Sequence, residues 1–475
     1  MNSPGHRVTE NLSTILTDHL AAATFESLPP AAVSRAKTRL LDAVGLIAAG
    51  PRAQGSQDVL RLVAGWGGRP DATVLTTTQR VPAMNAAFVN AVLMRSYDFE
   101  PVGADRADGA QIPSHITGTT ASVALAVGEA SGATGRELLA AMVYGDDLAA
   151  RLGHATGFDV YGGGDNTGTI NVLGGTATAG ILMGLDADGM RRALGLAINQ
   201  LGGTIDNIND KTLAFKLPIA LSARNAVFSA ELAATGFGGP VDPIGGRFGF
   251  LNQWGQERAD EGITAGLGSE FFADAVIKPW PTCRASQASL DATVQLIERN
   301  NVRAEDVERC VVHVTPKTKA GFVGQPFTVG ASPEVSGAFS IVFAVATALL
   351  HGTVELQHMG EPHMSDPRLA AMLQRVELEA SLPADEVRTA EVEVWLRSGA
   401  RHRVRVEQVL GDIHFAPLGA ERIAEKFHKN VAWNGSIGEA EAGELREFVL
   451  GIENAENLSL LPARLAGRAA EHAGG

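Results

Sequence analysis

The chain has 475 residues, about three times the length of a typical domain, so one to three folded units are expected. Hydrophobic residues make up 45% of the chain and charged residues 19%, which excludes a disordered protein and allows a large core. A net charge of −14 argues against nucleic acid or an anionic membrane as the partner.

Only two cysteines occur, Cys283 and Cys310, which excludes a disulfide framework and fits a reducing compartment. The N-terminus lacks a basic start followed by an apolar run, so no signal peptide is expected. The longest apolar stretch, residues 339–350, is shorter than the roughly 20 residues that a bilayer requires. We therefore expect a cytoplasmic globular protein with no membrane partner.

The first half of the chain is typical of packed helices. Val33, Leu40 and Val44 belong to an apolar face with three- and four-residue steps, and Pro30 marks the start of that helix, which ends before Gly50. Further helices are predicted at residues 84–94, 119–130, 135–152, 172–183, 187–201 and 219–234.

The composition changes after residue 268. Val392 and Val394 alternate with polar residues, and Gly399 precedes a second alternating run, which predicts a β-hairpin. Other strands are expected near 307–316 and 375–381, with helices at 286–299 and 337–350, and helical patterns return in the last sixty residues. The fold class is therefore mainly α, with a helical domain at residues 1–268 and 413–475 and an inserted α+β domain at residues 269–412.

Four segments carry residues suited to chemistry, although the sequence has no Walker loop, GxSxG or HExxH motif. The first places Asp98 at the end of a helix and His115 after a polar, glycine-rich loop that can fold back. A carboxylate beside an imidazole can orient it for proton transfer. The alternative is a helix-capping aspartate and an unrelated loop histidine.

The second segment offers Asp165 before a helix, either as an N-cap or as a second carboxylate of the site. In the third, Lys216 precedes an apolar helix whose positive end disfavours a lysine, so it is a candidate for binding a substrate carboxylate, or a solvated side chain.

The fourth segment, KPWPTCR at residues 278–284, lies at the junction of the two predicted domains. Two prolines stiffen it, and Lys278 and Arg284 can neutralise carboxylates. Cys283 is either a thiol acid–base group or a small buried residue. The spacing of the candidate ligands does not predict a zinc site.

Read together, these segments resemble the MmgE/PrpD family, which includes 2-methylcitrate dehydratases, cis-aconitate decarboxylases and iminodisuccinate epimerases. The similar stretches span nearly the whole chain, and the most specific of them is KPWPTCRASQASLDA. Others are AAFVNAVLMRSYDFE, HITGTTASVALAVGE, GGTATAGILMGLD, LSARNAVFSAELAATGFGGP and AEKFHKN. The resemblance implies a helical domain with a smaller lid, a homodimer, and an active site between the domains that uses no metal or organic cofactor.

The resemblance also implies site residues. Asp98, His115 and Lys278 fall on the family's aspartate, histidine and lysine, Asp165 falls where members have His or Asp, and Lys216 lies within one residue of a family lysine. Cys283 stands where some members have Cys and the decarboxylases have His.

Other positions depart from the family pattern. Arg95 replaces a histidine, Glu100 and Pro101 replace two aspartates, Ile116 replaces a proline, and Gln287 stands where many members have histidine. An arginine at position 95 adds a permanent positive charge that can bind an extra carboxylate. We count Arg95, Lys216, Cys283, Arg284 and Gln287 as candidate substrate-binding residues.

The resulting hypothesis is a lyase that dehydrates a 2-methylcitrate-like acid. His115 is the acid–base group, Asp98 its orienter, Lys278 the clamp for a carboxylate or enolate, and Asp165 a further catalytic carboxylate. The alternatives are an epimerase or decarboxylase of a related acid, and a catalytically silent binding protein.

Overall fold

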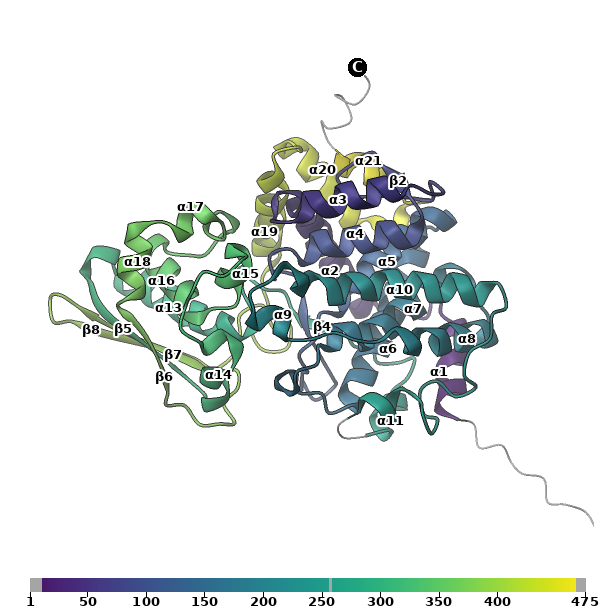
Figure 1. The fold of residues 1–475 in the computed structure, drawn as a ribbon, viewed down its shortest axis with the longest axis horizontal. Helices are drawn as coiled ribbons and strands as arrows, with labels where there is room; N and C mark the ends of the chain where they lie inside the picture. Colours follow the sequence, from purple (N-terminus) through teal and green to yellow (C-terminus); the bar gives the residue numbers. More distant parts are fainter. Residues whose placement is uncertain (1–10, 256–258, 467–475) are drawn as a thin grey trace, which may run out of the picture.

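The structure, a computed structural model, describes residues 11–255 and 259–466 and consists of a large helical body and a smaller α+β body (Figure 1). The helical body contains α1 (Leu12–Ala21), α2 (Pro30–Ala49), α3 (Ser56–Trp66), α4 (Ala83–Arg95), α5 (Ile116–Ser131), α6 (Gly135–Ala155), α7 (Ile170–Leu182), α8 (Ala187–Ala197), α9 (Asp206–Asn209), α10 (Leu217–Ala234), α11 (Phe250–Trp254) and α12 (Glu261–Thr264). The predicted fold class is confirmed.

Small residues let the central helices approach closely. Helix α7 packs against α5, α6 and α10, and α4 packs against α5 and α10. At the contact of α6 and α7, a methyl group on Gly145 would lie 2.7 Å from the carbonyl oxygen of Gly174. The Ala- and Gly-rich faces of the sequence therefore produce closely packed helix layers.

Helices from the end of the chain complete this body. They are α19 (Ala420–Asn434), α20 (Glu439–Leu450) and α21 (Leu460–Ala466). Helices α19 and α20 contact α2, so both ends of the described chain contribute to the helical body. None of the helices in the described residues has the length and apolar content needed to cross a membrane.

The smaller body is a four-stranded sheet partly covered by helices. Its elements are α13 (Arg284–Asn300), β5 (Val307–Val314), α14 (Pro316–Ala320), α15 (Pro333–Ala338), α16 (Ile341–His351), α17 (Glu361–Met364), α18 (Pro367–Leu373), β6 (Val376–Ala380), β7 (Ala390–Leu396) and β8 (Arg401–Val406). The strand order is β6-β5-β7-β8, with β6 parallel to β5 and the other pairs antiparallel.

Two sequence predictions for this body are confirmed to different extents. The hairpin of β7 and β8 is confirmed, with Val392 opposite Val404 and Gly399 at a φ of +85°. The helix predicted at 337–350 is confirmed as α16 but begins later than predicted, because α15 ends at Ala338 and α16 begins at Ile341. The hydroxyl of Ser340 accepts a hydrogen bond from the backbone N–H of Phe343 and starts the second helix.

Two short strand pairs lie outside the main sheet: β1 (Ala72–Thr73) pairs with β2 (Arg80–Val81), and β3 (Val102–Ala104) pairs with β4 (Asp274–Val276). Sequence analysis predicts a loop where β3 lies, because three residues with a distant partner leave no periodic pattern. Strand β4 falls within the predicted lid at 269–412 yet pairs with a strand of the helical body. The domain boundaries, and the homodimer, stay predictions.

The β3–β4 pair places the segment that leads to Lys278. Next to it, the backbone N–H of Ile277 donates to the carbonyl of Gly411 at 3.1 Å. Gly411 has a φ of +98°, and a methyl group there would lie 2.0 Å from the carbonyl oxygen of Ile277. Only glycine fits this position without displacing the chain beside Lys278.

We therefore expect Gly411→Ala to destabilise the protein more than Gly399→Ala. Both residues have positive φ, but a methyl group on Gly399 would meet nothing within 4 Å. Backbone strain alone costs about 1 kcal/mol, so Gly399→Ala should lose about that much, and Gly411→Ala roughly 2 kcal/mol more. Urea unfolding of both variants measures the difference, and equal losses would contradict the described packing.

Candidate active site

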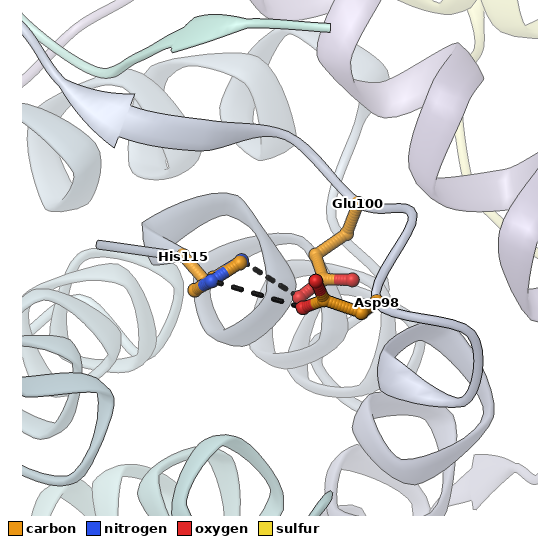
Figure 2. A group of neighbouring side chains, drawn as sticks. All are labelled: Asp98, Glu100 and His115. Atoms are coloured by element: carbon orange, nitrogen blue, oxygen red, sulfur yellow. Dashed lines mark ion pairs between the residues drawn. The ribbon is translucent and has the colours of Figure 1, made fainter. Parts of the chain in front are cut away.

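The candidate site is built where α4 ends and the chain turns towards β3. Arg95 is the last residue of α4, and Asp98 and Glu100 follow in the turn, all three almost fully buried. His115 stands directly before α5 and reaches the same point from the other side of the loop (Figure 2). The expectation that this loop folds back to bring Asp98 near His115 agrees with the 4.0 Å between their Oδ1 and Nε2 atoms.

Arg95 occupies the centre of the cluster. Its Nη1 atom donates to carboxylate oxygens of both Asp98 and Glu100, and it lies 3.3 Å from Nδ1 of His115. Burial alone would lower the pKa of Arg95, but the charges of Glu100, Asp98 and Asp165 outweigh it and raise that pKa. Arg95 is therefore a fixed cation held by two carboxylates.

Glu100, not Asp98, makes the close contact with the imidazole. Its Oε1 atom lies 2.7 Å from Nδ1 of His115 (Figure 2). Burial would raise the pKa of Glu100, but Arg95, His115 and Lys278 together lower it, so the side chain is a carboxylate. The orienting role predicted for Asp98 stays a prediction, but Glu100 is the closer carboxylate. Glu100 is placed to accept the Nδ1–H, which leaves Nε2, 3.4 Å from Nη1 of Arg95, as the basic nitrogen.

Two residues that sequence analysis missed hold the start of α5. Asp274, from β4, accepts hydrogen bonds from the hydroxyl of Ser114 at 2.9 Å and from the backbone N–H of Thr117 at 2.8 Å. Asn171 donates to the carbonyl of His115 at 2.8 Å. Asp274 thus caps a helix from a distant strand, and no local pattern in the sequence could have indicated it.

Lys278 connects the proline-stiffened turn to the cluster. Its side chain is fully buried, and Nζ lies 3.1 Å from Oδ2 of Asp98 while also donating to the Asp98 carbonyl. Asp98 has a φ of +50°, a conformation that costs free energy for any residue except glycine. The contacts with Lys278 and Arg95 stabilise this strained turn.

A cavity of about 420 Å³ opens beside the cluster, between the helical and the α+β bodies. Five of the candidate residues line it: Arg95, His115, Asp165, Cys283 and Arg284. Its volume is within the range of about 300–1,000 Å³ typical of small-molecule sites. The other candidates, Asp98, Lys278, Lys216 and Gln287, do not line it.

Lys216 and Gln287 bind the protein itself. Lys216 donates to the carbonyl of Gln54 at 2.8 Å, and burial lowers its pKa to about 8. The amide of Gln287 donates to the carbonyls of Trp280 and Thr282 at 3.1 and 2.9 Å, so it braces the proline-rich turn. The geometry therefore gives both residues structural contacts in place of the predicted contact with substrate.

Asp165 and Cys283 both line the cavity, and Asp165 also makes a structural contact. The carboxylate of Asp165 accepts from the backbone N–H of Thr167 at 3.0 Å and from its hydroxyl at 2.7 Å, which is the capping role that the sequence left open. Burial, and secondarily the charge of Asp98, raise the pKa of Cys283 to about 12, so its side chain is a neutral thiol.

A second cavity, of about 520 Å³, lies on the other side of the proline-rich turn. Its lining includes Trp280 and Lys426 but no histidine, and Nζ of Lys426 lies 2.6 Å from a carboxylate oxygen of Asp42. It offers no imidazole among its described lining residues and its buried cation is already paired, so the smaller cavity is the candidate active site.

Three ligand atoms at the site have the spacing of a possible metal centre. One atom each from Asp98, Glu100 and His115 lie within 4.8 Å of one another. The guanidinium of Arg95 already donates to both carboxylates and lies beside the imidazole. A metal ion would have to displace or repel this permanent cation, so the donor set fits ion pairing better than metal binding.

Comparison with known proteins identifies the family. A model of the MmgE/PrpD N-terminal domain matches residues 14–261, and a model of the MmgE/PrpD C-terminal domain matches residues 280–453. The chain belongs to the MmgE/PrpD family. The two matched regions correspond to the helical body and to the α+β body with α19 and α20, and the cavity lies between these bodies.

Several relatives in the MmgE/PrpD family are cis-aconitate decarboxylases. The human protein is 26% identical over 407 residues, covering 82% of this chain and 80% of the relative, and the mouse protein is 25% identical over 388 residues, covering 77% and 74%. The Aspergillus terreus protein is 21% identical over 465 residues and covers 92% of each chain.

We expect alkylation of Cys283 by iodoacetamide to be slow and to rise about tenfold per pH unit between about pH 7 and pH 10 without levelling off, because a thiol with a pKa of about 12 is far from half-ionised there. Peptide mass spectrometry can follow Cys283 separately from Cys310. A rate that rises tenfold per pH unit and then levels off near pH 8.5 would contradict the described environment.

Proposed function

We propose that this protein is a lyase that acts on a small polycarboxylate in the cavity between its two bodies, with His115 transferring the proton. The observation that carries the proposal is the contact of 2.7 Å between His115 and the Glu100 carboxylate, next to a cavity that His115 itself lines. An imidazole fixed in this way can remove or deliver a proton at carbon next to a carboxylate.

The residues of the buried cluster and the residues of the cavity wall have different roles in this proposal. Glu100 holds the Nδ1–H of His115, which leaves Nε2 to exchange a proton with the substrate. The fixed charge of Arg95, which also lines the cavity, can stabilise negative charge that develops on a substrate carboxylate or enolate. Lys278 acts indirectly: it contacts Asp98 and so holds the turn that carries Glu100.

Dehydration of a hydroxy acid such as 2-methylcitrate is the first candidate reaction. In that reaction His115 removes the proton next to a carboxylate, and hydroxide leaves from the neighbouring carbon. The presence of Cys283 favours it, since the resemblance places a histidine at this position in the decarboxylases.

Decarboxylation is the second candidate, because the relatives named above are cis-aconitate decarboxylases whose match covers most of this chain. Here carbon dioxide leaves first, and His115 then returns a proton to the carbanion. An epimerase on the same scaffold would return the proton to the opposite face of the carbon.

The test is incubation of the purified protein with 2-methylcitrate, citrate and cis-aconitate in D₂O, followed by NMR. Loss of water from 2-methylcitrate or citrate to give an unsaturated acid indicates dehydration, release of carbon dioxide indicates decarboxylation, and deuterium at the α-carbon without loss of water or carbon dioxide indicates epimerisation. His115→Ala should abolish whichever reaction occurs. Turnover of none of the acids by the wild type would reject the substrate class.

Replacing Glu100 tests the positioning of the imidazole. We expect Glu100→Gln to lower kcat by about 10²-fold or more with a smaller change in KM, because Glu100 contacts His115 and does not line the cavity. Glu100→Asp keeps the charge and should retain part of the activity.

A matched control separates this effect from the loss of any buried carboxylate. The side chain of Glu129 is 6% exposed, accepts a hydrogen bond from the backbone N–H of Thr73 at 2.7 Å and pairs with Arg80 at 2.8 Å. Glu129→Gln should lower the melting temperature and leave kcat within about twofold. The positioning role of Glu100 would be refuted by a Glu100→Gln enzyme with the kcat of the wild type.

A further inference from the structure

Two arginines on the wall of the active-site cavity are not used by the buried cluster. Arg284 is the first residue of α13, and Arg388 lies in the segment between β6 and β7. Both line the cavity. Neither has a carboxylate oxygen within ion-pair distance among the residues that the structure describes, and their recorded partners are neutral groups.

The other cations of the cavity are already paired. Arg95 is held by Asp98 and Glu100, and Nζ of Lys317 lies 2.9 Å from a carboxylate oxygen of Asp159. On the described cavity wall, Arg284 and Arg388 are thus the permanent cations that no carboxylate of this chain neutralises, so their charge is available to a ligand.

Arg284 is partly buried and has an incomplete set of acceptors. Its Nη2 atom donates to the side-chain oxygen of Gln111 at 2.6 Å, and the Gln111 amide donates to Asp412 at 2.8 Å, so an amide separates the guanidinium from the nearest carboxylate of this chain. The Nε atom of Arg284 is inaccessible to solvent and has no acceptor within the described residues. An unpaired charge with a buried donor costs free energy, and an anion bound at the accessible part of the guanidinium can offset part of that cost.

The electrostatic surroundings agree with this geometry. Burial lowers the pKa of Arg284 to about 10, the charge of Asp412 acts against this, and the charge of Arg388 lowers it further. The positive charges of Arg284 and Arg388 repel each other across the cavity wall. A ligand carboxylate bound between them would reduce that repulsion. The N-terminus of α13 adds its own positive potential at Arg284.

Arg388 belongs to the α+β body, but its side chain contacts the helical body. Its Nη2 atom donates to the carbonyl of Gly109 at 3.0 Å, in the loop that precedes His115. The guanidinium carbon lies 5.0 Å from the centre of the Phe415 ring. These contacts hold the planar group in place while leaving donor atoms for a ligand.

We propose that Arg284 and Arg388 form a subsite for a substrate carboxylate distant from the carbon at which His115 acts. This inference rests on the proposed function and deepens it, because it requires a substrate with at least two carboxylates. Recognition of the distant carboxylate places the reacting carbon beside His115, so an acid with one carboxylate would bind weakly and in no fixed orientation.

The experiment measures binding by calorimetry, which needs no turnover. The ligands are tricarballylate, glutarate and butyrate, with three, two and one carboxylates and neither a hydroxyl group nor a double bond to react. The wild type should bind tricarballylate and glutarate at least about tenfold more tightly than butyrate. Arg388→Gln and Arg284→Gln should each weaken tricarballylate by about tenfold or more and leave butyrate unchanged.

Two further variants control the result. Arg388→Lys keeps the charge but loses the planar fork, and should weaken tricarballylate less than Arg388→Gln. Arg309→Gln removes an exposed arginine of β5 that pairs with Glu377, far from the cavity lining, and should bind like the wild type. Circular dichroism verifies that each variant is folded.

The outcomes separate this inference from the proposed function. If the wild type binds none of the three acids, the proposed function fails. If the wild type prefers tricarballylate over butyrate and both glutamine variants keep the same preference, the subsite is refuted while the proposed function stands. A loss of equal size for all three ligands would also refute the subsite, since it would indicate a general change of the cavity.

Discussion

The candidate site depends on a balanced group of buried charges, in which Arg95 and Lys278 face the carboxylates of Asp98 and Glu100. Transferring an ion from water to a protein interior costs several kcal/mol, so each charge is tolerated only because a partner of opposite sign is in contact. The same contacts stabilise the left-handed backbone of Asp98. Removing any one charge would leave its partner buried and uncompensated, which makes the cluster both rigid and intolerant of substitution.

This cluster also determines how the two bodies of the protein share one cavity. Lys278 follows β4 and begins the turn that leads into α13, so its contact with Asp98 fixes the chain that presents Cys283 and Arg284. Strand β4 carries Asp274, which holds the first turn of α5 and therefore the backbone at His115. The proposed acid–base group His115 and the proposed carboxylate-binding arginine Arg284 thus depend on the same short stretch of chain.

The sequence predicts the elements of this site better than their contacts. Helix periodicity, the β-hairpin and the proline-stiffened turn are local signals, and they identify Asp98, His115 and Lys278 as candidate residues. Which carboxylate contacts His115 depends on the direction in which a strained turn points its side chains, and that is a property of the folded structure. For the same reason, the inward-facing contacts of Gln287 and the capping of α5 by Asp274 could not be predicted from neighbouring residues.

We expect the substrate to lie between His115 and two arginines of the α+β body, Arg284 and Arg388. The most direct measurement of this claim is a crystal structure of the protein with tricarballylate bound. We expect one carboxylate within hydrogen-bond distance of Arg284 and another beside His115, with Arg95 still paired with Glu100. Tricarballylate bound instead in the second cavity, against Trp280 and Lys426, with the first cavity free of ligand, would contradict it.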